Sequence, residues 1–146
     1  MKTFDHIEAY LQAHGLLTLA TVNEKCMPIA HSVEYIHEGN TVYFISNHAT
    51  RKIANIKNNA NVSYTVDEDY KDWSVIQGIQ MIGKASIVDD PKEVGRLMKI
   101  YAQKFPQVMS FPSEFVEAMR VVRIEPFQAR YIDNTQGMGY AEELEY

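Results

Sequence analysis

The chain has 146 residues, of which 46% are hydrophobic and 23% are charged, and its formal net charge is −5 at pH 7. This composition is typical of one globular domain over residues 1–146, and the negative charge disfavours nucleic acid as the main partner. The single cysteine excludes an internal disulfide, and no apolar run approaches the roughly twenty residues of a membrane span. We therefore expect a cytoplasmic protein that binds neither nucleic acid nor a membrane.

The first part of the chain predicts a helix and then three antiparallel strands. Apolar residues at helical spacing predict an N-terminal helix within residues 1–14, with Gly15 as its C-terminal cap. Strands are expected at residues 16–22, 29–37 and 41–46. Within the second strand, His31 and Val33 should face one side of the sheet, and Ser32 the other. Strands joined by tight turns indicate a meander or a barrel.

A short helix should follow the third strand. Asn47 or Thr50 can cap it, and the pair Asn58-Asn59 can end it. Its first turn carries two cations, Arg51 and Lys52. At that end of a helix the backbone N–H groups point outward and the macrodipole is positive, so each cation is unfavourable by a few tenths of a kcal/mol.

An anion at this helix start would reverse the sign of that interaction. A phosphate could accept hydrogen bonds from the hydroxyls of Ser46 and Thr50 and pair with Arg51 and Lys52. The alternative is a surface helix that carries two solvated cations. The local sequence leaves both interpretations open.

The second part of the chain predicts further strands and two helices. Strands are expected at residues 61–66, 74–88, 119–124 and 127–132, and helices at residues 90–105 and 113–118. Gly78 and Gly83 predict bulges or a close approach of another backbone. The apolar stripe that includes Tyr101 and Phe105 is interpreted as core packing. Pro126 is expected to break the final strand.

One stretch resembles a known family motif. Phe44-Ile45-Ser46-Asn47-His48-Ala49-Thr50-Arg51-Lys52, followed by Ile56 and Asn59-Ala60, is similar to the flavin-phosphate motif of the pyridoxamine 5′-phosphate oxidase family. LLTLATVNEKCMPIAHSVEYIHEGNTVYF resembles the opening strands of that family, and GKASIVDDPKEV resembles a later strand, turn and helix. The resemblance extends over roughly residues 15–133.

The resemblance implies a fold, a cofactor and an assembly. The fold would be a mainly β split barrel of about six mostly antiparallel strands with peripheral helices, in a homodimer with the flavin site at the subunit interface. The protein would be an FMN-binding oxidoreductase for a small molecule, without a metal. Because the flavin carries the redox chemistry, no catalytic side chain is required. The implied FMN-binding residues are Arg51, Lys52, Thr50, Ser46, Asn47, His31, Ser32, Val33 and Gln77.

The chain also departs from the oxidase pattern. No Arg or Lys lies between Pro28 and His37, and residues 76–80 lack the two arginines that the oxidases carry there. We therefore do not expect a true pyridoxamine phosphate oxidase. In the tail, residues 133–146, Met138 and Tyr140 replace the Phe and His of small family members.

Three alternatives remain open at the level of sequence. A haem-binding split barrel would need an axial ligand, with His31, His48 or Met138 as candidates. A flavin-binding stress protein would hold FMN without catalysis, and a deazaflavin could replace FMN. Phosphate-loop, dinucleotide-binding and His-Glu-x-x-His zinc motifs are absent from the sequence.

Overall fold

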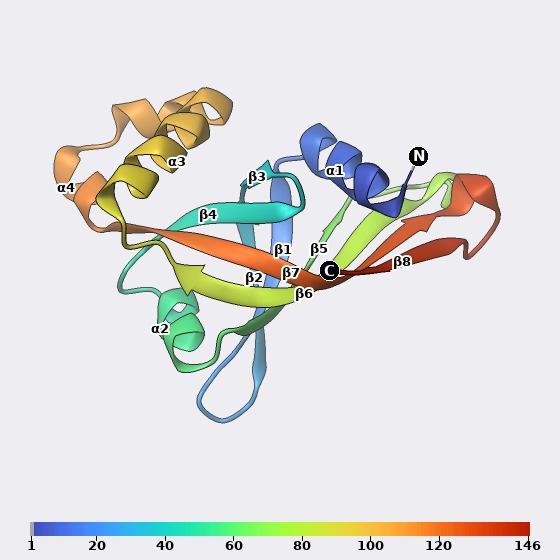
Figure 1. Ribbon diagram of the computed structural model, residues 1–146, viewed down its shortest axis with the longest axis horizontal. Coiled ribbons are helices and arrows are strands. Elements are labelled where there is room, and N and C mark those ends of the chain that lie inside the picture. Colours follow the sequence, from blue (N-terminus) through green and yellow to red (C-terminus); the bar gives the residue numbers. More distant parts are fainter. Residues whose placement is uncertain (1) are drawn as a thin grey trace.

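The computed structural model describes residues 2–146, which form one curled sheet of eight antiparallel strands with helices at its periphery (Figure 1). The strands are β1 (Leu16–Val22), β2 (Pro28–Glu34), β3 (Ile36–Glu38), β4 (Thr41–Asn47), β5 (Asn61–Asp67), β6 (Gln77–Ile87), β7 (Met119–Asp133) and β8 (Ala141–Glu145). The helices are α1 (Thr3–Ala13), α2 (Arg51–Asn58), α3 (Pro91–Lys104) and α4 (Ser113–Glu117), and short 3-10 turns are η1 (Trp73–Val75), η2 (Pro106–Ser110) and η3 (Asn134–Gln136).

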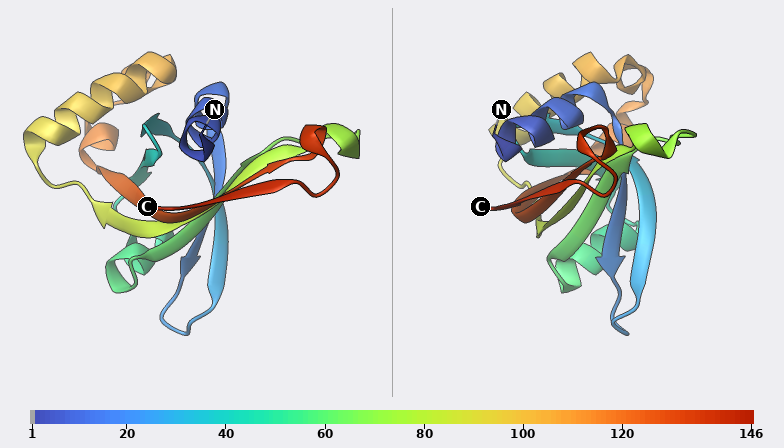
Figure 2. Two further views of the ribbon diagram at one scale, coloured as in Figure 1. Left: turned by 45° about the vertical axis from the view of Figure 1, so that its right-hand side comes forward. Right: turned by 90° about the vertical axis from the view of Figure 1, so that its right-hand side faces the viewer.

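The order of the strands leaves the barrel open on one side. Neighbouring strands follow the order β2-β1-β5-β6-β7-β4-β3, and β8 pairs with β7. The strands β2 and β4 therefore do not pair with each other, and the two ends of the curled sheet face across a gap, which we call the split. Figure 2 shows how strongly the sheet twists as it curls toward this opening. The expected split barrel is confirmed.

Two apolar clusters lie on opposite faces of the sheet. The first cluster fills the inside of the curl and includes apolar side chains of α1 together with residues such as Leu19, Phe44 and Val122. The second lies between the outer side of β4 and α3, around Tyr43 and Leu97. Leu97 and Tyr101 of α3 belong to this second cluster, which confirms that the α3 stripe is mainly packing. Neighbouring residues of β4 belong to different clusters because successive side chains of a strand point to opposite faces.

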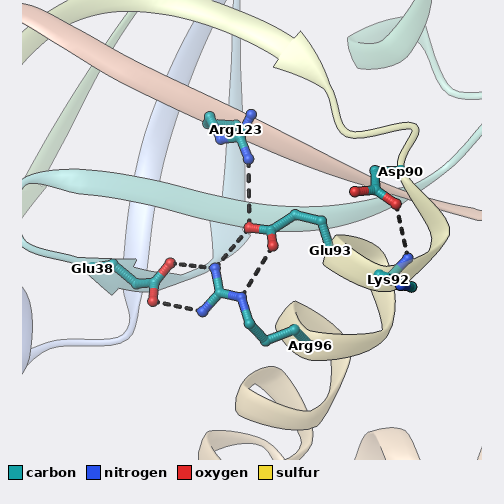
Figure 3. Close-up of polar contacts among 6 residues, drawn as sticks. All are labelled: Glu38, Asp90, Lys92, Glu93, Arg96 and Arg123. Atoms are coloured by element: carbon teal, nitrogen blue, oxygen red, sulfur yellow. Dashed lines mark hydrogen bonds and ion pairs between the residues drawn. The ribbon is translucent and has the colours of Figure 1, made fainter.

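A network of charged side chains fixes α3 against β3 and β7 (Figure 3). Arg96 donates two hydrogen bonds of 2.8 Å to Glu38 of β3 and also pairs with Glu93 at 2.7 Å. Arg123 of β7 lies 3.6 Å from the same Glu93. Hydrogen bonds from Arg96 lower the pKa of Glu38 and of Glu93. The network is exposed, so it orients α3 more than it stabilises the fold.

The structure corrects the predicted second strand and the first helix end. Residues 29–37 form two strands with a break at Tyr35, whose N–H donates to the carbonyl of Gly15 and whose hydroxyl donates to the carbonyl of Leu11. Tyr35 and Ile36 are therefore both buried, although alternation placed them on opposite faces. The first helix ends with His14 in an extended conformation, and Gly15 does not have the positive φ of a glycine cap.

The structure also corrects the later strands. The strand expected at residues 74–88 begins only at Gln77, after η1, and β7 continues through Pro126. Gln128 pairs with Ile82 and Pro126 pairs with Gly83, so Phe127 is an extra residue of β7 and forms a β-bulge. The tail was not predicted as a strand, yet β8 pairs with β7.

Tyr64 provides a test of the inner core. Its hydroxyl is buried and has no hydrogen-bond partner among the described residues. An unsatisfied buried hydroxyl destabilises the folded state. Tyr64→Phe is therefore expected to raise the free energy of unfolding by about 1 kcal/mol in urea denaturation. A loss of stability would show that the hydroxyl has a partner in solution.

Candidate functional site

The edges of β2 and β4 that face the split have unpaired backbone. The one partner of β2 is β1, and β3 pairs only with residues 41–43 of β4. The stretch from Phe44 to Asn47 is therefore not covered by a strand on this side. Alternate N–H and C=O groups of an edge strand point away from its partner and can bind a ligand.

The start of α2 lies at the end of β4 and has free donors. Thr50 is the N-cap residue, as expected, but its side chain makes no capping hydrogen bond. Instead its hydroxyl lies 2.9 Å from that of buried Ser46 and donates to the carbonyl of Asn47 at 3.0 Å. The Asn47 side chain accepts from the Ala49 N–H at 2.8 Å. The first turn of α2 therefore has neither a side-chain cap nor an acidic residue.

Two cations and one histidine face this helix start. Arg51 and Lys52 occupy the first helical turn, and Arg51 is exposed. Burial lowers the pKa of His31 on β2, and the charges of Lys52 and Arg51 lower it further. Hydrogen bonds through Thr21 link His31 to Asn55 of α2 and so place it beside this helix. The structure thus brings together Ser46, Thr50, Arg51, Lys52 and His31, which we call the cationic cradle.

A hydrogen-bond network anchors the cradle to the barrel. The hydroxyl of Thr21 on β1 lies 3.3 Å from Nε2 of His31. The same hydroxyl accepts from the side-chain amide of Asn55 on α2 at 3.0 Å. Thr21 and Asn55 are both buried. The network therefore fixes β2 and α2 relative to each other, and sequence reasoning did not single out either residue.

Three predicted residues lie elsewhere. Val33 is buried in the inner core, and Ser32 is exposed on the outer face of the sheet. Gln77 begins β6 and donates to Asp133 at 3.3 Å. The other end of β6 lies beside α2, because Ala85 bonds to the carbonyl of Ala60. A strand of this length spans roughly 30 Å, so Gln77 does not reach the cradle of its own chain.

The candidate haem ligands are not gathered either. His48 is exposed on the turn before α2, and Met138 is exposed in the connection between β7 and β8. In Figure 1, α2 lies to the left and this connection to the right. His31 is already engaged by Thr21.

Tyr101 of α3 lies beside both edges of the split. The Tyr101 hydroxyl donates to the carbonyl of Glu34 on β2 at 2.9 Å, and Ile45 of β4 packs against the apolar cluster that contains Tyr101. Burial raises the pKa of Tyr101. Sequence reasoning assigned Tyr101 to packing alone, and only its polar hydroxyl within an apolar stripe signalled another role.

The outer face of β1, β5 and β6 carries a row of small polar side chains. Thr18 pairs with Ser32 and with Thr65, and Gln80 pairs with Thr65 and with Arg130. A hollow of about 410 Å³ on this face includes Thr65, Gln80 and Arg130. Ile82, 40% exposed, lies in the same hollow. We call this surface the outer face.

Two further findings limit the chemistry of the site. Within residues 2–146, no three His, Cys, Asp or Glu side chains gather in a way that could hold a metal ion. None of the helices in this part of the chain is long and apolar enough to cross a bilayer. The cradle instead offers cations, hydroxyls and backbone donors, which together suit a phosphate.

Comparisons with known proteins agree with this fold. A family model described as pyridoxamine 5′-phosphate oxidase matches residues 3–133. A putative pyridoxamine 5′-phosphate oxidase from Listeria innocua is similar in structure, with a TM-score of 0.74 and 23% identity over 89% of this chain and 98% of that chain. General Stress Protein 26 from Bacillus anthracis gives a TM-score of 0.71 and 21% identity over 100% of both chains.

The same fold also occurs in a haem protein. HutZ, a haem storage protein from Vibrio cholerae, gives a TM-score of 0.70 and 19% identity over 86% of this chain and 91% of that chain. A search of curated proteins gave no match. Identities this low show a shared fold, so the ligand must be inferred from the residues of the site.

Proposed function

Because the chain belongs to the pyridoxamine 5′-phosphate oxidase family, we propose that it binds FMN in the split and acts as a cytoplasmic FMN-dependent oxidoreductase. The observation that carries this proposal is the start of α2, where uncapped backbone donors, two hydroxyls and two cations converge. Such a helix start favours a dianionic phosphate. Riboflavin lacks that phosphate and should bind more weakly.

Four residues of the cradle act on the phosphate. Arg51 and Lys52 neutralise its charge, while the Ser46 and Thr50 hydroxyls donate to its oxygens. Thr50 can turn its proton from the Asn47 carbonyl toward the ligand, because a hydroxyl rotates freely. The unpaired edges of β2 and β4 offer backbone groups to the polar edge of the flavin ring.

A bound flavin would supply hydride or single-electron transfer between a reduced nicotinamide or small organic substrate and an acceptor. The chain itself supplies binding and orientation. The cradle contains no residue that must act as a general acid or base, since His31 is held by Thr21 and stands among cations. Neutral His31 can donate one hydrogen bond to a hydroxyl of the ribityl chain or accept one from it.

The direct test is an absorption spectrum of the purified chain after FMN has been added and unbound FMN removed. Retained flavin absorption, which a reduced nicotinamide then bleaches, is the expected result. A protein that retains no FMN would disprove the proposal. A Soret band after haem loading would then favour haem, and flavin that no donor bleaches would indicate a non-enzymatic flavin protein.

The titration of His31 gives a second test of the cradle. Its pKa lies below the usual value of about 6.5, so its protonation disfavours the folded state as pH falls below that value. A bound anion offsets this cost. Sulfate, whose charge is constant over this range, should therefore raise the Tm more at about pH 5.5 than at about pH 8. In His31→Gln, sulfate should raise the Tm equally at both pH values. An equal rise at both pH values in the wild-type protein would contradict this placement of His31.

We further propose that a second copy of the chain covers the outer face and completes the flavin site. No helix covers the row of Thr18, Thr65 and Gln80 in the described chain, and Ser32 belongs to this row. Gln77, remote from the cradle of its own chain, could then approach the flavin of the partner. Small polar side chains around an exposed isoleucine are consistent with a wet, self-complementary interface.

Ile82→Glu tests this assembly. A carboxylate in place of the apolar side chain would have to be desolvated when a second copy covers the hollow, so the dimer should dissociate in sedimentation analysis and FMN should bind at least about tenfold more weakly. Met27→Glu, which changes an exposed methionine in the turn between β1 and β2, is the control and should remain dimeric. A dimeric Ile82→Glu protein would rule out this interface.

A further inference from the structure

A second cavity lies beside the split, on the α3 side of β4. Its volume is about 300 Å³, which is at the lower end of the range for small-molecule sites. Six apolar side chains form most of its wall: Ile45, Tyr101, Phe105, Val108, Phe111 and Phe115. Aromatic rings from α3 and from the segment that follows it thus surround a space that can take a flat ring.

The one charged residue that lines this aromatic pocket is Glu34, whose carboxylate adds to the effect of burial in raising the pKa of Tyr101 in the same wall. Glu34 makes no ion pair within the part of the chain that the structure describes. The nearby Lys104 is directed elsewhere, since it donates to the carbonyl of His14 at 2.8 Å and lies over the Tyr35 ring. The pocket is therefore negative, without a cation that could hold a phosphate or a carboxylate.

The walls of the pocket are held in place by contacts that are independent of any ligand. The charged network around Arg96 fixes α3 to β3 and β7, and the Tyr101 hydroxyl is hydrogen-bonded to β2. Phe111 and Phe115 meet edge to face with ring centres 4.7 Å apart. A rigid aromatic wall of this kind is preorganised for binding.

We propose that the aromatic pocket binds a planar aromatic compound that carries a positive charge or N–H donors, and that it excludes anionic analogues. The rings stack on the aromatic part of the ligand, and Glu34 accepts hydrogen bonds from its cationic group. Glu34 and Ile45 also belong to the two edges of the split. Under the proposed function, on which this assignment as substrate rests, the compound therefore meets the flavin at the split.

The experiment compares two probes that share an indole ring but differ in charge. Tryptamine is a cation and indole-3-acetate an anion, and calorimetry measures the binding of each to the full chain with and without FMN. Tryptamine is expected to bind at least about tenfold more tightly. Glu34→Gln should remove this preference and Glu34→Lys should reverse it. Glu24→Gln, a change at an exposed carboxylate in the turn after β1, should leave the preference unchanged.

A further variant and one measurement separate the possible outcomes. Phe111→Ala should weaken both probes equally, and circular dichroism verifies that each variant is folded. The proposal would be overturned if neither probe bound or if both bound equally well. Displacement of tryptamine by FMN would also overturn it, since the flavin ring would then occupy the pocket. Flavin absorption is measured in the same samples. Tryptamine bound by a chain that retains no FMN would disprove the flavin function while the site for aromatic cations stands.

Discussion

Replacing Arg51 by alanine is expected to weaken FMN binding roughly ten- to hundredfold, or about 1.5 to 3 kcal/mol, the range of a hydrogen bond to a charged group. Arg51 is exposed in the first turn of α2, where no side chain caps the helix and no acidic residue balances the two cations. Because these cations oppose the helix dipole, the fold does not need Arg51. The measurement is the quenching of FMN fluorescence during titration with the chain.

Two controls isolate the phosphate contribution. Lys57→Ala removes a cation from the last turn of the same helix, where it is not directed at the cradle, and should leave FMN affinity within about twofold. Riboflavin carries the same ring without the phosphate, so Arg51→Ala should not change its affinity. Unchanged FMN affinity in Arg51→Ala would show that the phosphate does not lie at the start of α2.

Local signals predicted the elements whose boundaries depend on local chemistry. The helix expected at residues 90–105 begins at Pro91, and the Asp90 side chain caps it by accepting from the N–H of Lys92 at 3.1 Å. Ile53 and Ile56 of α2 lie three residues apart, which places them on one face of a helix, and both are buried. In these cases one turn of chain contains both the residue and its partner.

The errors fall where distant residues decide the conformation. The break at Tyr35 depends on hydrogen bonds to Leu11 and Gly15, which local alternation cannot reveal. Pro126 stays within β7 because the adjacent bulge at Phe127 accommodates a residue without an N–H group. Tertiary contacts therefore override the local pattern at both positions.

The site shows the same division. The proximity of four residues could be predicted because they lie within one strand-to-helix turn: Ser46, Thr50, Arg51 and Lys52. Helical periodicity could not show that Tyr101 and the residues around it enclose a cavity, since a core and a pocket wall have the same apolar stripe. The distance of Gln77 from α2 follows from strand order, which no local motif contains.

Gly83→Ala is expected to lower the free energy of unfolding by about 3 kcal/mol. A Cβ at this position would lie 2.5 Å from the carbonyl oxygen of Glu125 and 3.1 Å from Cγ2 of Ile124. The obstruction is backbone of the neighbouring strand, at the register shift between β6 and β7, so a rotamer change cannot relieve it. Urea denaturation measures the loss.

Gly95→Ala makes the same chemical change where nothing lies within 4 Å of the added Cβ, on the exposed side of α3. There the gain in helix propensity should raise the free energy of unfolding by about 0.5 to 1 kcal/mol. If the free energy of unfolding falls in Gly83→Ala and rises in Gly95→Ala, then the close approach of the neighbouring strand, and not chain entropy, requires glycine at residue 83. If Gly83→Ala were as stable as the wild type, β7 would have to move away from β6, and the bulge would not be needed to curl the sheet.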